Sequence, residues 1–168
     1  MSLVHLRLLI SALLLLGAHC SYAACVNEDP ALVAKSFYEN HSGFHSDDPA
    51  NIKSIISPRL YSALSREHKC SRNELCAVEA DPWTDAQDGE ITKPIRFKTT
   101  QKKGTTAAVR MSYAFSLSDN RRWRQSVLVR LERNSVQGCW LISDLVSPKG
   151  QSLVGHIENW HRRFGNVL

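Results

Sequence analysis

The sequence predicts an α+β domain in which N-terminal helices pack on a curved antiparallel sheet of about four strands, followed by a short C-terminal helix. Two observations lead to this cone-like fold. Apolar residues recur at helical spacing before residue 70, and they alternate with polar residues from residue 93 onward. Short polar connections separate the alternating segments and suit hairpins. A sheet that curls over the leading helices would form a cone with a pocket.

Two helices are expected before the sheet. Asp29 precedes Pro30, and Ser57 precedes Pro58. In each pair the first residue is a good helix cap, and proline suits the first turn. The polar stretch HSGFHSDDP lies between the two helices and breaks the first one.

Period-two patterns predict the strands at residues 93–101, 105–118, 122–133 and 139–146. In the second of them Val109, Met111 and Tyr113 alternate with polar or small neighbours, which indicates one buried face. The last segment, SLVGHIENWHRRFG, has apolar residues three and four apart and predicts a final helix.

Residues 1–23 have the pattern of a secretory signal peptide, with a basic start, an apolar run and small residues before Ala24. The apolar run is shorter than the roughly 20 residues of a membrane-spanning helix. We expect cleavage near Ala23, a single domain over residues 24–168, and a periplasmic or secreted protein. The alternatives are an uncleaved anchor, or a lipid anchor on Cys20 or Cys25, whose preceding residues match a lipobox poorly.

The chain has 21 Lys and Arg against 16 Asp and Glu, and the leader contributes only one of these charges. This mild excess of positive charge favours solubility and weak contact with anionic envelope surfaces. We therefore expect no nucleic-acid partner and at most peripheral membrane contact. The partner would be an envelope protein or a small ligand, no cofactor is expected, and the sequence indicates no oligomeric state.

Four cysteines follow the predicted cleavage site, and an even number in an exported chain indicates disulfides. Three pairings are possible. The short spacing between Cys70 and Cys76 favours a bridge there, which leaves Cys25 to pair with Cys139. The spacing does not fit a zinc site.

The stretch DPWTDAQDG is the candidate binding loop, with Asp81, Trp83, Asp85, Gln87 and Asp88 as its candidate residues. Its acidic residues do not stand at the alternating positions of a calcium loop, so no metal site is expected. The stretch fits a hydrogen-bonded turn better. Asp81 would cap it, Gln87 would satisfy two backbone groups, and Trp83 would bury its ring.

Acid–base chemistry in a cone fold would need a carboxylate and a partner such as tyrosine in an apolar pocket. Tyr113 and Asp144 are the candidates, but alternation favours a core role for Tyr113 and a solvated or capping role for Asp144. No catalytic triad is indicated. Surface positions are expected for the five histidines after the leader: His41, His45, His68, His156 and His161.

The most basic stretch is DNRRWRQ, in which Trp123 lies between arginines. It could meet phosphates of lipid or lipopolysaccharide, with Trp123 at the interface. A charged hairpin end that discourages aggregation explains the same pattern, and so we favour that interpretation. Tyr113 and Trp123 complete the candidate binding residues.

Four segments resemble a bacterial family, the domain of unknown function 3828. They are AKSFYENH, ISPRLYSAL, DPWTDAQD and CWLISDLVSPKGQSL, in the family's order. The resemblance implies a small exported protein or lipoprotein with a nuclear-transport-factor-like or ketosteroid-isomerase-like cone fold. It implies no activity, because the family has none assigned and the fold hosts many functions.

Since no acid–base pair stands out, we expect a non-catalytic domain of the bacterial cell envelope that binds a ligand or protein in the periplasm. An enzyme acting on a small apolar substrate is the first alternative. An immunity or inhibitor protein against a periplasmic effector is the second.

Overall fold

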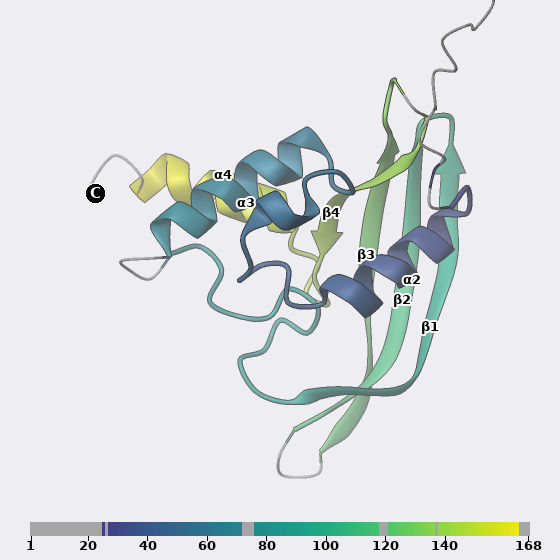
Figure 1. Cartoon of the computed structure of the whole chain (residues 1–168). Helices are drawn as coiled ribbons and strands as arrows, with labels where there is room; N and C mark the ends of the chain where they lie inside the picture. The colour runs from purple at the N-terminus through teal and green to yellow at the C-terminus, as the bar shows by residue number, and fades with distance from the viewer. Residues whose placement is uncertain (1–24, 26, 72–75, 118–120, 137, 165–168) are drawn as a thin grey trace, which may run out of the picture.

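The computed structural model describes residues 25, 27–71, 76–117, 121–136 and 138–164. The expected signal peptide and its cleavage site lie outside these residues. The elements, in chain order, are α2 (Pro30–His41), the 3₁₀ helix η1 (Pro49–Ile52), α3 (Pro58–Cys70), β1 (Glu90–Lys103), β2 (Thr106–Ser116), β3 (Arg122–Arg133), β4 (Trp140–Val146) and α4 (Leu153–Phe164) (Figure 1).

The strands form one antiparallel sheet in the order β1-β2-β3-β4, so each strand pairs with its neighbour in sequence. The sheet is curved, and β1 bends across its lower end in Figure 1. Helices before the sheet, the curved antiparallel sheet and the short C-terminal helix confirm the predicted α+β class.

The helix starts follow the local signals in the sequence. The carboxylate of Asp29 accepts a hydrogen bond from the Ala31 amide at 2.9 Å, and the Ser57 hydroxyl accepts one from the Leu60 amide at 3.2 Å. These bonds satisfy amides that have no partner inside a helix. α2 lies against β1, β2 and β4, whereas α3 contacts β4 and packs beside α4 (Figure 1).

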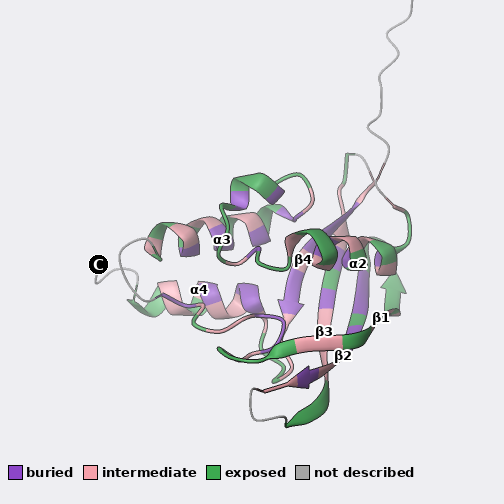
Figure 2. Cartoon of the chain, turned by 60° about the horizontal axis from the view of Figure 1, so that its bottom comes forward, coloured by how far each residue is buried: buried purple, intermediate pink, exposed green. Residues whose placement is uncertain are grey.

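The register of the sheet separates a buried face from an open one. Val109 is opposite Val129, and Met111 is opposite Val127; all four are buried. The intervening Arg110 faces the other side of the sheet and is exposed. Figure 2 shows buried positions on β2, β3 and β4, while β1 is exposed or half-buried along its length.

The sequence analysis predicts a pocket on the concave side of the sheet. In the structure, side chains fill this space. Phe37 and Phe44 from the α2 region and Trp83 from the candidate loop are buried there, with ring centroids 5.2 to 6.2 Å apart. Tyr38 and Phe97 pack at the margin of this aromatic cluster. Residues from the α2 region, the loop and the sheet therefore form one continuous core.

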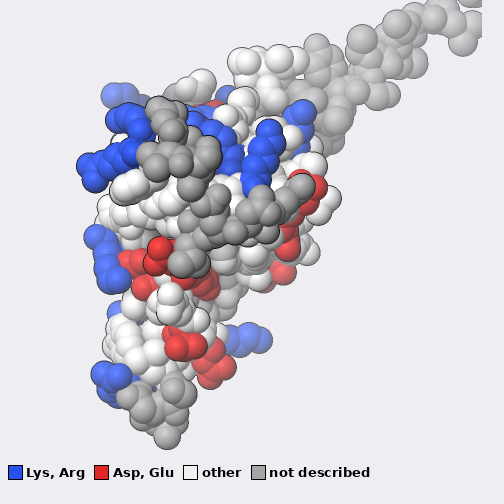
Figure 3. Space-filling model, turned by 90° about the vertical axis from the view of Figure 1, so that its left-hand side faces the viewer, with Lys and Arg blue, Asp and Glu red and all other residues white. Residues whose placement is uncertain are grey.

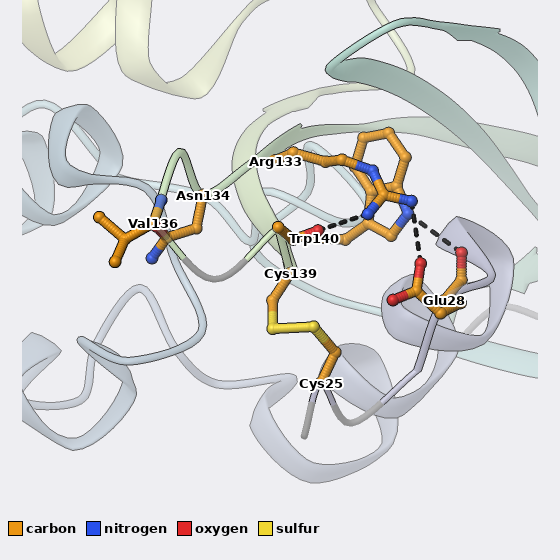
Figure 4. Close-up of a disulfide and its surroundings, with 8 residues drawn as sticks. Cys25, Glu28, Arg133, Asn134, Val136, Cys139 and Trp140 are labelled. Carbon is orange, nitrogen blue, oxygen red and sulfur yellow. Dashed lines mark hydrogen bonds and ion pairs between the residues drawn. A yellow bond between two sulfur atoms is a disulfide. The ribbon is translucent and has the colours of Figure 1, made fainter. Parts of the chain in front are cut away.

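Both predicted disulfides are present. Cys70 pairs with Cys76 directly after α3, and Cys25 pairs with Cys139 over a sequence separation of 114. Beside the second bridge, the Arg133 guanidinium lies 4.6 Å from the Trp140 ring centre and 2.9 Å from a Glu28 carboxylate oxygen (Figure 4). The beginning of the described chain is thus attached to the connection between β3 and β4.

Candidate functional site

The stretch from Asp81 to Ala86 is a closed turn. The Asp81 amide donates to the Ala86 carbonyl at 3.1 Å, and the Asp81 carboxylate accepts from the Trp83 amide at 2.8 Å. Asp85 has a φ of 55°, in the left-handed region that aspartate tolerates in turns. These contacts are those of the hydrogen-bonded turn that the sequence predicts, with Asp81 as its cap.

The side chain of Gln87 departs from its expected role. Within the described part of the chain it makes one hydrogen bond, from Nε2 to the Glu79 carbonyl at 3.4 Å, and not the two that were predicted. Asp88, which the sequence offered as a candidate binding residue, is exposed.

Trp83 attaches the loop to the helical layer. Its ring is buried, and its indole N–H donates to the Ser42 carbonyl at 2.8 Å. Burial of the ring together with a satisfied N–H is the arrangement expected for a structural tryptophan.

The hydroxyl of Tyr113 is held by structural contacts. It hydrogen-bonds to the Trp83 carbonyl and lies 3.1 Å from Oε1 of Gln125. The side chain is buried, and burial is the main cause that raises the pKa of Tyr113. This confirms the core role of Tyr113. Its hydroxyl proton is donated to the carbonyl of Trp83 in the loop.

Asp144 is buried, and its carboxylate supports the start of α4. One oxygen accepts from the Val154 amide at 3.1 Å, and the other accepts from the Ser152 hydroxyl at 2.7 Å and lies 3.2 Å from Arg130. Of the two predicted alternatives, a solvated or a capping carboxylate, the capping role is confirmed. Its contacts are all distinct from those of Tyr113, so the two do not form an acid–base pair.

The expectation of surface histidines is wrong for α4. Nε2 of His156 lies 2.7 Å from the Ala77 carbonyl, and its Nδ1 lies 2.8 Å from Nε2 of Gln151. Nε2 of His161 lies 3.2 Å from the buried Glu67. Both rings are half-buried because α4 packs against α3 and the segment that follows it.

Asp81 is the centre of a group of side chains with shifted pKa values. Burial raises the pKa of Asp81, although the hydrogen bond from Trp83 and the nearby His45 act in the opposite direction. Burial lowers the pKa of His45 and raises that of Tyr38. Burial is the largest cause of the pKa shift of each of these groups. The shifts therefore reflect the packing of the loop more than a charge relay.

The open face of the sheet forms a basic groove of about 1060 Å³. We use this name for the hollow whose lining includes the cations Arg96, Lys98, Arg110, Arg122, Arg124 and Lys149. No carboxylate is among the described residues that line it. All of these cations except Lys149 lay on predicted strands. Arg96, Lys98 and Arg110 were not among the candidates, and the signal that could have identified them was the basic character of the polar positions on those strands.

Two of the candidate binding residues from the sequence, Tyr113 and Trp123, line this groove. Trp123 lines it, is 39% exposed and contacts the edge of Phe115, with 5.2 Å between ring centroids. Tyr113 also lines it and reaches the loop through Trp83, while Lys149 lies 3.2 Å from Asp85. The loop therefore contacts residues that line the groove, but none of its five candidate residues, Asp81, Trp83, Asp85, Gln87 and Asp88, lines it.

Among the described residues, no group of three or more His, Cys, Asp or Glu side chains is placed to hold a metal ion. None of the described helices is both long and apolar enough to cross a bilayer.

No protein-family model matches the chain, and no curated protein and no solved structure matches it.

Proposed function

We propose that this chain is an exported, non-catalytic binding domain of the bacterial cell envelope, with the basic groove as its binding surface. The proposal includes cleavage near Ala23, a periplasmic location, and membership of the domain of unknown function 3828 family, which rests on the four motifs alone. Two disulfides support export, because such bridges persist mainly in oxidising compartments.

The observation that carries the proposal is the contrast between the two faces of the sheet. The groups suited to acid–base work are occupied: on the concave face Tyr113 by the Trp83 carbonyl, and on the open face Asp144 by Arg130 and the start of α4. On the open face, cations gather in a hollow with no lining carboxylate among the described residues. Uncompensated charge in a concave surface suits recognition of an oppositely charged ligand or protein.

Fractionation of cells that express the full-length chain tests the location, and chemical crosslinking in the periplasm followed by mass spectrometry tests the binding role. We expect the protein in the periplasmic fraction and a defined crosslinked complex or a co-purifying ligand. A cytoplasmic protein would contradict the proposal. So would turnover of a small apolar substrate that is lost in Tyr113→Phe, provided that this variant remains folded.

A further inference from the structure

We infer that the basic groove holds an extended, carboxylate-rich segment of a partner protein. This inference rests on the proposed binding function and names the chemistry of the partner. Three observations support it: the spacing of the cations, the small side chains between them, and the lack of ion pairs to most of these cations among the described residues.

The cations stand at the spacing of alternate side chains in an extended chain. Arg96 and Lys98 are two positions apart on β1, and therefore on one face and about 7 Å apart. Lys98 is opposite Arg110 on β2, and Arg124 of β3 is opposite Ala114 of β2. Carboxylates at alternate positions of an extended peptide have the same spacing of about 7 Å.

Small side chains lie between these cations. Ser112 of β2 is opposite both Arg96 on β1 and Ser126 on β3, and Ala114 follows Ser112 on the same face. Their short side chains leave the hollow open over the centre of the sheet. A peptide backbone can lie over Ser112, Ala114 and Ser126 while arginines on either side reach its carboxylates, which they bind well in a bidentate manner.

The charge of the groove is only partly balanced within the described part of the chain, where Lys149 forms an ion pair with Asp85. Arg96, Lys98, Arg110 and Arg124 have no ion pair there. By register, the acids Glu90 and Glu132 on this face lie at the ends of β1 and β3, and Asp144 on β4 is paired with Arg130.

The pair formed by Lys98 and Arg110 is informative because like charges directly opposite one another destabilise a sheet. Protection of a sheet edge does not account for Arg110, because β2 is an inner strand. An anionic partner in the groove would balance this repulsion.

The shape of the surface favours a peptide over a lipid headgroup layer. The cations line a hollow, which a flat bilayer surface cannot follow, whereas an extended chain can lie inside it. Trp123 is packed against Phe115 and only partly exposed, so it does not stand out as a membrane-anchoring aromatic would.

The test is fluorescence anisotropy with a labelled peptide in which Glu alternates with Ser, and with a second peptide of the same composition whose Glu residues form one block. The proteins are the mature wild type, the groove variant Arg96→Gln/Arg110→Gln/Arg124→Gln, and the control variant Lys69→Gln/Arg162→Gln/Arg163→Gln. The control removes the same charge from exposed positions at the ends of α3 and α4, a face on which acidic and basic side chains both occur (Figure 3).

We expect the alternating peptide to bind the wild type and the control variant equally, and the groove variant about tenfold more weakly. Wild-type binding should weaken as salt is added, a result that does not depend on the folding of any variant. Equal loss in both variants, equal affinity for both peptides, or no binding would overturn the inference. So would binding only to phosphatidylglycerol vesicles or to inorganic phosphate.

Periplasmic crosslinking with the same variants separates this inference from the proposed function. A complex that forms equally well with the groove variant would leave the binding function standing and exclude the groove. If no complex forms with the wild type and the peptide does not bind, both proposals fail.

Discussion

Nε2 of His161 on α4 lies 3.2 Å from Oε2 of Glu67 on α3, inside the interface between the two helices. The other Glu67 oxygen accepts a hydrogen bond from the Val78 amide at 2.7 Å. The Glu67 carboxylate thus joins three segments: α3, the chain after the Cys70–Cys76 bridge, and α4.

Glu67→Ala should lower the free energy of unfolding by about 2–3 kcal/mol, because the half-buried Val78 amide and the half-buried His161 imidazole lose the carboxylate they contact. Glu67→Gln should lower it by about 1 kcal/mol, since its amide oxygen can still accept from Val78. Urea denaturation followed by circular dichroism measures both. Glu79→Ala, at an exposed position, is the control and should stay within about 0.5 kcal/mol of the wild type.

The two disulfides should differ in their contribution to stability. In the chain-entropy model a bridge over about 100 residues contributes roughly 4–5 kcal/mol, and one over about seven residues roughly 2 kcal/mol. Cys25→Ser/Cys139→Ser should therefore lower the melting temperature more than Cys70→Ser/Cys76→Ser. Thermal melts check the order, and thiol counting on the unfolded mature protein should find no free cysteine. Four reactive thiols would contradict both bridges.

Asp81→Ala should lower the free energy of unfolding by about 1 kcal/mol, because the Trp83 amide loses the carboxylate that caps the turn. Asp81→Asn should be close to neutral or stabilising, since its side-chain oxygen still accepts while the partly buried charge is removed. Denaturant titration of both variants provides the measurement. Millimolar calcium should leave the wild-type melting temperature unchanged; a clear rise would show that the loop binds the ion.

His45 should make the protein less stable at mildly acidic pH. Burial, opposed by Asp81 and Asp47, lowers the pKa of His45 in the folded protein below the usual 6.5. As the pH falls below about 6.5 the unfolded chain therefore takes up a proton that the folded chain does not, and stability decreases.

The melting temperature should accordingly fall less between about pH 7.5 and pH 5.5 in His45→Gln than in the wild type. The difference between the two proteins isolates His45 from the other histidines. Parallel pH profiles would show that the burial of His45 has no such effect.

Local signals were sufficient to predict the elements of this fold. The Asp29–Pro30 and Ser57–Pro58 pairs identified helix starts within a few residues, and the alternation around Met111 identified the buried face of β2. These features depend only on residues that are close in sequence, so they can be predicted without knowledge of the tertiary structure.

The long-range contacts of the site could not be predicted in this way. Glu67 and His161 are 94 positions apart, and the periodicity of neither helix indicates which polar residue faces the other. The basic groove depends on the pairing of β1, β2 and β3, since a shift of one residue would move Arg110 to the other face. The sequence identified Trp123 and Tyr113 but not Arg96, Lys98 and Arg110, which only the register of β1 and β2 places beside one another.

The nearest-neighbour order of the strands has a consequence for the biogenesis of an exported chain. Under the proposed export, each hairpin can form as soon as its two strands have left the translocation channel, and such locally connected topologies fold comparatively fast. The bridge between Cys25 and Cys139 must wait until β1, β2 and β3 have emerged, because Cys139 lies directly before β4. Oxidation of this pair would therefore follow the emergence of the first three strands and would fix the N-terminal end of the described chain to a sheet that is already forming.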